Sequence, residues 1–167
     1  MKKQLGLLLL TLVSFSLILA CSTNSNTPAP TSPVVGQFDI NRVELTDFPT
    51  SFTIYNSVVT SATALGSDTY LFNADNTYSD NYTYSTPNST STNSETGSYV
   101  YAPATQVVAL TPAAQNGQAV QPYMLLYSST ANELSTGKIA RQDSVPNPVT
   151  GKNQWIAYNV NYVYKKR

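Results

Sequence analysis

Histidine is absent from this 167-residue sequence, and cysteine occurs once, at Cys21. The lack of histidine removes the commonest general base, the usual zinc ligand and every Ser-His or Cys-His catalytic arrangement. A single cysteine also excludes an internal disulfide framework and a thiolate metal site. We therefore expect a protein that is not an enzyme and that carries no cofactor and no metal. A hydrolase based on carboxylates stays open, and Glu44 and Asp47 are close in sequence, but a strand end running into a turn explains both residues.

Charged residues are scarce as well, at 11% of the chain. From Cys21 onward, nine acidic residues stand against seven Lys or Arg, which gives a formal charge of −2. A nucleic-acid-binding protein needs a basic surface, so nucleic acid is excluded as a partner. The basic end of the chain, Lys165 to Arg167, is predicted to be a solvated terminus.

The one long apolar run lies at the N-terminus. Lys2 and Lys3 precede an almost wholly apolar or small segment, Leu5 to Ala20, which is typical of a secretory signal peptide. A transmembrane helix would need about 20 apolar residues, and this segment is shorter and contains Thr and Ser. We expect residues 1–20 to be removed after export.

The segment Ile18-Leu19-Ala20-Cys21 resembles the lipobox of bacterial lipoproteins. In that family the cysteine is diacylated on sulfur and becomes the first residue of the mature chain, so the resemblance implies that Cys21 is the lipid-attachment residue. Two or three acyl chains, at about 0.8 kcal/mol per buried methylene, hold a protein firmly on a membrane. Ser22 follows, whereas lipoproteins retained at the inner membrane typically carry Asp there. The resemblance therefore implies an outer-membrane lipoprotein of the cell envelope, on the periplasmic face.

Residues 21–35 are predicted to be the lipidated cysteine and a flexible linker. The sequence "STNSNTPAPTSPVV" is rich in Ser, Thr, Asn and Pro and lacks charge and aromatic residues, so it cannot bury enough surface to offset the entropy of ordering. Residues 36–167 remain, a length that suits one domain with a core.

Short runs of Tyr, Val, Thr, Ile and Phe separated by Gly, Pro, Asn and Asp predict an all-β domain. Turns are predicted at Ala74 to Asn76 and at Asn116-Gly117. The expected strands are 38–45, 52–60, 70–72, 77–84, 97–101, 107–110, 123–127, 133–141 and 155–166, and the polar stretch Ser85 to Thr96 is expected to be a mobile loop. In the last strand, one face carries Ile156, Tyr158, Val160, Tyr162 and Tyr164, which we expect to point inward. Such a small antiparallel meander of about eight strands removes its edges by closing into a barrel.

The succession "LFNADNTYSDNYTY", "GSYVY" and "QVVAL" resembles a pattern of lipocalin-like bacterial lipoproteins, a family of small antiparallel barrels. The shared pattern is Phe-x-x-Asp-Gly/Asn-Thr-Tyr, then Gly-x-Tyr, then an apolar strand. These are turn and strand signatures, and no catalytic residue comes with them. The resemblance implies a lipocalin-like barrel that could hold a small apolar ligand.

Tyrosine is abundant, with twelve residues. Aromatic side chains can line a ligand cavity, or they can stabilise a sheet as cross-strand pairs worth roughly 0.2–1 kcal/mol each. The first alternative predicts a non-catalytic binding module for a small apolar or amphipathic ligand, and the second is compatible with a β-sandwich adhesion or assembly module that contacts protein or glycan partners. The candidate ligand-binding residues are Tyr99, Tyr101, Leu125, Tyr127, Tyr158 and Tyr162. The sequence does not indicate an oligomeric state.

Overall fold

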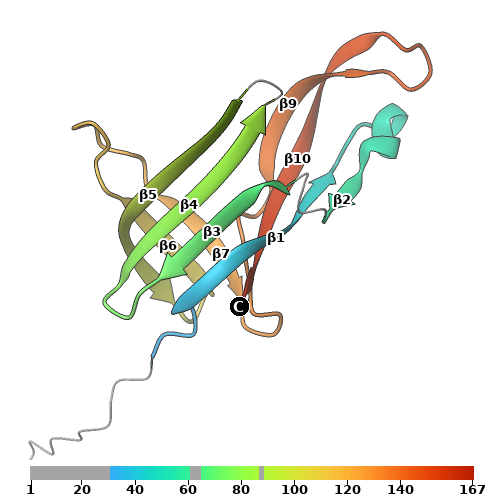
Figure 1. The fold of residues 1–167 in the computed structure, drawn as a ribbon. Helices are drawn as coiled ribbons and strands as arrows, with labels where there is room; N and C mark the ends of the chain where they lie inside the picture. Colours follow the sequence, from blue (N-terminus) through green and yellow to red (C-terminus); the bar gives the residue numbers. More distant parts are fainter. Residues whose placement is uncertain (1–30, 61–64, 87–88) are drawn as a thin grey trace, which may run out of the picture. The chain divides into compact units, whose positions relative to one another are not determined.

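The computed structural model describes residues 31–60, 65–86 and 89–167 of the chain. Ten β-strands and one short 3-10 helix make up this part (Figure 1). They are β1 (Gly36–Thr46), η1 (Thr50–Tyr55), β2 (Ser57–Val59), β3 (Ser67–Phe72), β4 (Thr77–Thr86), β5 (Ser89–Ala102), β6 (Val107–Pro112), β7 (Tyr123–Ser128), β8 (Glu133–Ser135), β9 (Ile139–Pro146) and β10 (Asn153–Lys166).

Eight of the strands form a closed antiparallel barrel. The order around it is β1, β3, β4, β5, β6, β7, β8 and β10, and β10 pairs back with β1 over Phe38↔Lys166 to Thr46↔Asn159. The closure removes the free edges over the paired residues, whereas residues 91–95 of β5 have β4 as their only partner among the described strands. The predicted all-β, lipocalin-like barrel of about eight strands is thereby confirmed.

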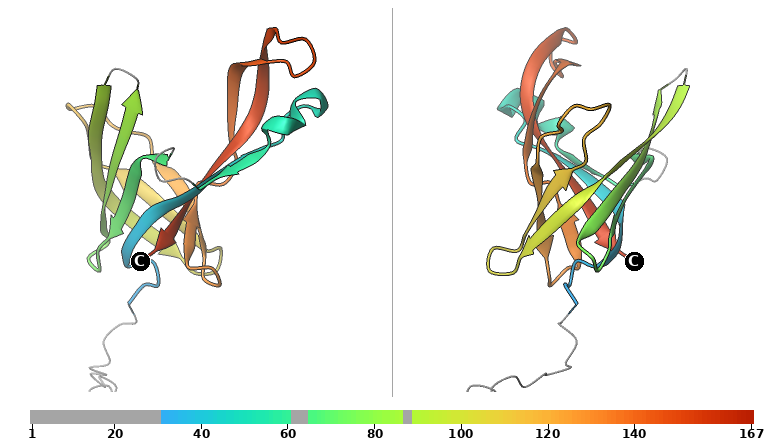
Figure 2. Two further views of the ribbon diagram at one scale, coloured as in Figure 1. Left: turned by 45° about the vertical axis from the view of Figure 1, so that its right-hand side comes forward. Right: turned by 90° about the vertical axis from the view of Figure 1, so that its left-hand side faces the viewer.

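β1 and β10 extend beyond the barrel, and each pairs there with one of the two remaining strands. β2 pairs with the second half of β1, over Val43↔Val59 to Leu45↔Ser57, and β9 pairs with the first half of β10, over Asn153↔Pro146 to Val160↔Ile139. We call this part, residues 43–59 and 139–160, the extension. In both views of Figure 2 the extension and the β4–β5 pair rise from the same end of the barrel, which we call the extension end. The C-terminus lies at the opposite end, the base.

A β-bulge at Asn41 sets which side chains of β1 face inward. The register with β10 shifts by one residue between Ile40↔Tyr164 and Arg42↔Val163. A bulge places two residues opposite one, so the inward positions change from even to odd numbers. Phe38 and Ile40 therefore share a face with Val43 and Leu45, and Arg42 turns outward.

Three expectations from the sequence were wrong in detail. The strand expected at 52–60 begins as the helix η1, which buries Phe52, and only Ser57–Val59 is extended. The strand expected at 133–141 is two strands, β8 and β9, separated by Gly137 at φ 67°. The stretch 85–96, expected to be a loop, lies largely in β4 and β5, which pair as far as Thr86↔Ser89. Alternating Thr and Ser fit an exposed two-stranded ribbon as well as they fit a loop.

Both predicted turns are confirmed. The β3–β4 connection reverses at Asn73 to Asn76, where Asn76 has φ 65° and Asp75 accepts hydrogen bonds from the backbone N–H and the hydroxyl of Thr77. At Asn116-Gly117 both residues have positive φ, 50° and 77°, as a tight hairpin turn requires.

Aromatic and aliphatic side chains fill the barrel from its base. The buried cluster comprises Val34, Phe38, Tyr70, Phe72, Tyr78, Tyr99, Val108, Leu110, Leu125, Tyr127, Leu134 and Tyr164. Phe72 packs edge-on against both Phe38 and Tyr99, with ring centroids 5.9 and 4.9 Å apart. Gly97 leaves room for the Tyr78 ring, because a Cβ at this position would clash with the Thr111 carbonyl and lie 2.8 Å from that ring.

The extension has a small core of its own. Phe48, Phe52 and Ile156 are buried together beneath η1, with Tyr55 and Tyr158 packed against them. The rings of Phe48 and Tyr158 stack at 4.5 Å with an interplanar angle of 12°. The apolar face of β10 thus serves two clusters, one in the barrel and one in the extension.

Candidate functional site: the acidic interior at the extension end

The barrel interior changes from apolar to acidic toward the extension end. Along β3 the inward side chains are Phe72, Tyr70 and then Asp68, and along β4 they are Tyr78 and then Asp80. Asp80 lies directly opposite Glu95 of β5. Three carboxyl groups from three neighbouring strands therefore meet above the aromatic core. We call Asp68, Asp80 and Glu95 the acidic cluster.

Tyrosine hydroxyls surround the acidic cluster as hydrogen-bond donors. Tyr78 and Tyr123 both donate to Oε1 of Glu95, at 2.6 and 2.7 Å. The hydroxyls of Tyr70 and Tyr123 lie 3.3 Å apart, so Tyr70 can donate to Tyr123. Burial raises the pKa of Tyr70 and of Tyr123, which keeps both phenols protonated and able to donate.

Asp68 and Asp80 form an interacting carboxyl pair. They are diagonal neighbours on the inner face of β3 and β4, and their carboxyl groups are close enough to share a proton. Burial, followed by the neighbouring charges of Asp68 and Glu95, raises the pKa of Asp80 to about 8, and burial also raises the pKa of Asp68. Asp80 is only 7% exposed. Within the described residues, Oδ1 of Asp68 and Oδ1 of Asp80 are buried without a hydrogen-bond partner.

A pocket of about 500 Å³ adjoins this end of the barrel. Its wall comprises Val43, Leu45, Ala140, Arg141, Gln142, Asp143, Tyr158, Val160 and Tyr162. Tyr162 also packs against the barrel core, and Tyr164, two residues further along the same face of β10, bonds to Asp68. Tyr162 therefore lines the pocket and also contacts the barrel core. We call it the extension pocket.

A second hollow of about 550 Å³ is lined by residues of η1 and β9 and shares Leu45, Asp143 and Tyr158 with the extension pocket. Phe48, Ile54, Tyr55 and Val145 contribute its apolar wall. The hydroxyl of Tyr158 donates to Asp143, and this hydrogen bond raises the pKa of Tyr158 to about 12. Tyr158 thus lines both hollows and belongs to the extension.

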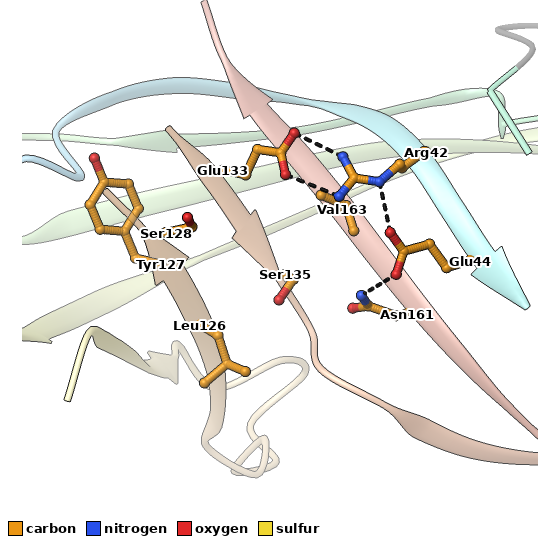
Figure 3. A pocket seen from close by; sticks show the side chains of 9 residues that line it. All are labelled: Arg42, Glu44, Leu126, Tyr127, Ser128, Glu133, Ser135, Asn161 and Val163. Atoms are coloured by element: carbon orange, nitrogen blue, oxygen red, sulfur yellow. Dashed lines mark hydrogen bonds and ion pairs between the residues drawn. The ribbon is translucent and has the colours of Figure 1, made fainter. Parts of the chain in front are cut away.

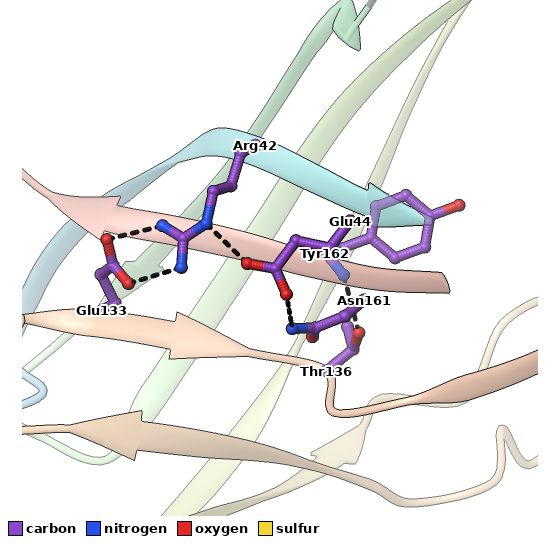
Figure 4. A network of polar contacts seen from close by, with 6 residues as sticks. All are labelled: Arg42, Glu44, Glu133, Thr136, Asn161 and Tyr162. Atoms are coloured by element: carbon purple, nitrogen blue, oxygen red, sulfur yellow. Dashed lines mark hydrogen bonds and ion pairs between the residues drawn. The ribbon is translucent and has the colours of Figure 1, made fainter. Parts of the chain in front are cut away.

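A smaller pocket of about 180 Å³ lies on the outer face of the barrel, where Arg42 is clamped between two glutamates (Figure 3). The Arg42 guanidinium makes a bidentate contact with Glu133, at 2.8 and 3.0 Å, and Nε donates to Glu44 at 2.7 Å. Asn161 donates to the other oxygen of Glu44, and the neighbouring Tyr162 N–H donates to Thr136 (Figure 4). The hydrogen bond from Arg42 holds the pKa of Glu44 below its usual value. All three guanidinium nitrogens of Arg42 are hydrogen-bonded to glutamates, and the pocket is smaller than the lower limit of about 300 Å³ that is usual for small-molecule sites. We therefore interpret this network as structural, a clamp that holds β1, β8 and β10 together.

The candidate residues from the sequence divide between three places. Tyr99, Leu125 and Tyr127 are buried in the barrel core, with Tyr101 packed against it, while Tyr162 lies at the junction and Tyr158 in the extension. The hydroxyls of Tyr99 and Tyr127 bond to the Asn73 carbonyl and to Asn132 in turns at the base. Of the six candidates, Tyr158 and Tyr162 line the extension pocket. Cys21 lies outside the described residues.

Sequence reasoning missed the acidic cluster. Asp68 lies two residues from Tyr70, and Asp80 lies two residues from Tyr78, so each carboxyl group is on the same face of its strand as a tyrosine. This spacing was the signal in the sequence for inward-facing carboxyl groups. Glu44 pairs with Arg42 and Asp47 with Lys138, so each of these two carboxylates has its own cation. In the described part of the chain, no group of three or more His, Cys, Asp or Glu side chains is placed to hold a metal ion.

Comparisons with known proteins identify no relative: no protein-family model, no curated protein and no solved structure matches the chain. Within residues 31–60, 65–86 and 89–167, no helix has the length and apolar character needed to span a membrane. The acidic cluster and the extension pocket are therefore interpreted from their own chemistry.

Proposed function

We propose that this protein is a lipid-anchored envelope protein that binds a small amphipathic molecule at the extension end of its barrel, without catalysing a reaction. The observation that carries the proposal is the extension pocket, whose wall includes Tyr162, a residue that also contacts the barrel core. Its volume of about 500 Å³ falls in the range of about 300–1,000 Å³ that is usual for small-molecule sites.

The deeper barrel supports this location for the ligand. Tyr99, Leu125 and Tyr127 are at most 4% exposed, so the base is packed with side chains. Eight-stranded barrels have an interior that side chains can fill or that can hold one small ligand. We therefore expect a ligand to bind above the packed layers, where Val43, Leu45 and Tyr162 are half-exposed.

A paired substitution on neighbouring strands tests the site. Val43→Asp puts a charge on the wall of the extension pocket, whereas Val58→Asp puts the same charge on the opposite face of the adjacent strand, where Val58 is 60% exposed. We expect the first variant to weaken binding of a fluorescent apolar probe at least about tenfold and the second to bind as the wild type does. A wild-type protein that binds no probe, and that carries no small molecule detectable by mass spectrometry after native purification, would overturn the proposal.

The anchor is tested separately, at the lipobox. Cys21→Ser removes the thiol that would be acylated, so we expect either a soluble form or an uncleaved precursor. Membrane fractionation and intact mass measure this directly. An unchanged mass and an unchanged membrane fraction would contradict the lipoprotein assignment.

A second candidate function, as an assembly module, is favoured by β9. This eight-residue strand pairs with β10 on one side, and its side chains are mostly exposed. Two copies placed antiparallel about Gln142 would bring Arg141 of each copy opposite Asp143 of the other, and opposite charges in such positions stabilise strand pairs. This arrangement predicts a homodimer through continuous sheets.

Charge reversal distinguishes this candidate. Arg141→Asp should dissociate such a dimer, and the double variant Arg141→Asp, Asp143→Arg should restore it, as measured by sedimentation. A monomeric wild type would exclude the assembly function and leave the ligand-binding proposal untouched.

A further inference from the structure

Among residues 31–60, 65–86 and 89–167, no positively charged side chain pairs with the acidic cluster. The four ion pairs formed by described residues involve Asp39, Glu44, Asp47 and Glu133, and none involves Asp68, Asp80 or Glu95. Buried carboxyl groups ordinarily lie beside a cation or retain a proton, because an isolated buried charge is very costly. The cluster is therefore suited to receive positive charge or hydrogen-bond donors from outside.

The shortage of donors can be located on individual atoms. Tyr78 and Tyr123 donate to Glu95, and Tyr164 donates to Oδ2 of Asp68. Apart from a proton that the two carboxyl groups can share, Oδ1 of Asp68 and Oδ1 of Asp80 are buried without a hydrogen-bond donor among the described residues, and Asp80 is more than nine-tenths buried. A primary ammonium group supplies three N–H donors and one positive charge, which matches this deficit.

The apolar part of such a ligand has a defined place. On β10, the Tyr164 hydroxyl donates to Asp68 of the acidic cluster, and Tyr162, whose Cα lies about 7 Å along the strand from that of Tyr164, lines the extension pocket. A ligand with an ammonium group at one end and an aromatic or alkyl group at the other would extend from Asp68, at the tip of the Tyr164 side chain, to Tyr162.

Building on the proposed function, we propose that the ligand is a small amphipathic primary amine. Its ammonium group contacts Asp68, Asp80 and Glu95, and its apolar group lies against Val43, Val160 and Tyr162 in the extension pocket. Arg141, at the rim of the same pocket, disfavours a second positive charge on the apolar part.

Ammonium binding competes with a proton. Without a cation, the Asp68–Asp80 pair retains a proton, because both groups are buried beside Glu95. The other titratable groups facing the pair are Tyr70, Tyr78, Tyr82, Tyr123 and Tyr164. Burial raises the pKa of Tyr70, Tyr78, Tyr123 and Tyr164, so these four stay neutral at physiological pH. An ammonium group that replaces the proton should therefore release it to solvent.

Three molecules with a similar apolar part and different charge test the proposal: phenethylammonium, phenethyl alcohol and hydrocinnamate. Titration calorimetry on the full chain at about pH 7, where an alkyl amine of pKa near 10 is protonated, should give at least about tenfold tighter binding of the ammonium compound. In buffers of different ionisation enthalpy, binding of the ammonium compound should show release of up to one proton.

Three variants identify the carboxyl group that the amine contacts. Asp80→Asn should abolish the preference for phenethylammonium and the proton release. Asp75→Asn, which neutralises an exposed carboxylate in the β3–β4 turn at the base of the barrel, should preserve both. If the preference is lost in Asp143→Asn, in the wall of the extension pocket, and not in Asp80→Asn, the amine binds at the rim and the proposal is wrong.

The outcomes also separate this inference from the proposed function. If the alcohol or hydrocinnamate binds as tightly as the ammonium compound, the protein binds amphipathic molecules and the amine proposal is wrong. If none of the three compounds binds and the apolar probe does not bind either, the proposed function fails as well.

Discussion

The hydroxyl of Tyr164 donates a hydrogen bond of 2.8 Å to Oδ2 of Asp68 and so joins the last strand of the barrel to β3 through the interior. The two residues are 96 positions apart in the chain. Both are held by barrel strands, with Tyr164 paired to Leu134 and Asp68 paired to Tyr82. The bond therefore links the aromatic core to the acidic cluster.

Tyr164→Phe should destabilise the fold by roughly 1–3 kcal/mol, because it preserves the shape of the ring but leaves a second oxygen of Asp68 buried without a donor. Denaturant unfolding measures the change. Tyr162→Phe is the matched control, since no hydrogen bond from the Tyr162 hydroxyl is found within the described part of the chain, and it should change stability little. Equal effects of the two substitutions would contradict a specific role for the Tyr164 hydroxyl.

Stability should depend on pH through Asp80. Burial raises the pKa of Asp80 to about 8, so the folded protein holds a proton that the unfolded chain releases near pH 4. This contribution is complete below about pH 4 and is lost as the pH rises through about 8, with a slope of up to about 1.4 kcal/mol per pH unit. Thermal or denaturant unfolding between these limits should show declining stability.

Asp80→Asn should reduce this fall in stability with rising pH. Asp143→Asn, which replaces an exposed carboxylate on β9, should leave the fall unchanged. At acid pH a second group, Glu44, makes stability depend on pH in the opposite direction. Hydrogen bonds from Arg42 and Asn161 lower the pKa of Glu44, so the stabilisation by Glu44 is lost as the pH falls below its usual titration range. Stability that rises steadily toward alkaline pH in the wild type would show that Asp80 is not protonated in the fold.

Arg42→Lys should cost roughly 1–3 kcal/mol of stability, because a lysine cannot reproduce the bidentate contact with Glu133 and the bond to Glu44 together. The side chains of Arg42, Glu44 and Glu133 are 16–28% exposed, so water screens their ion pairs only in part. Lys138→Met removes the ion pair with Asp47, whose side chains are 62% and 47% exposed, and should have little measurable effect. Double-mutant cycles with Glu133→Gln measure the coupling, and its absence would contradict the clamp.

The sequence predicted the barrel because alternation along β10 and the turn residues are local signals. One face of β10 does carry Ile156, Tyr158, Val160, Tyr162 and Tyr164, but Ile156 is buried and Tyr158 half-buried in the extension, whereas Tyr164 is buried in the barrel. Alternation identifies a buried face without identifying its partner. The bulge in β1 had a usable signal, since the apolar spacing changes from two residues to three between Ile40 and Val43.

The acidic cluster could not be predicted in the same way. A carboxylate at an inward position contradicts the simple pattern, because burying an unpaired charge is costly. Asp68, Asp80 and Glu95 come together only through the registers of β3 with β4 and of β4 with β5. A shift of one residue in either register would send a carboxylate to the other face.

Tyr158→Ala should open the extension while the barrel stays folded. The substitution removes the ring that stacks on Phe48 and the hydroxyl that donates to Asp143, and it should cost roughly 2–4 kcal/mol. Since Phe48, Phe52 and Ile156 form a cluster separate from the barrel core, the loss should be local. Hydrogen exchange should accelerate in η1, β2 and β9 and stay unchanged in β4, β5 and β6.

Tyr99→Ala is the matched control inside the barrel. Tyr99 is 2% exposed and packs against Phe72, so its removal should accelerate exchange in every barrel strand. If Tyr158→Ala also accelerates exchange throughout the barrel, the extension and the barrel unfold as one unit, and the extension pocket cannot open independently. If the accelerated exchange is confined to the extension, the part of the pocket wall that contains Tyr158 and Val160 can move independently of the barrel. The acidic cluster then stays fixed, because Asp68, Asp80 and Glu95 all lie on barrel strands.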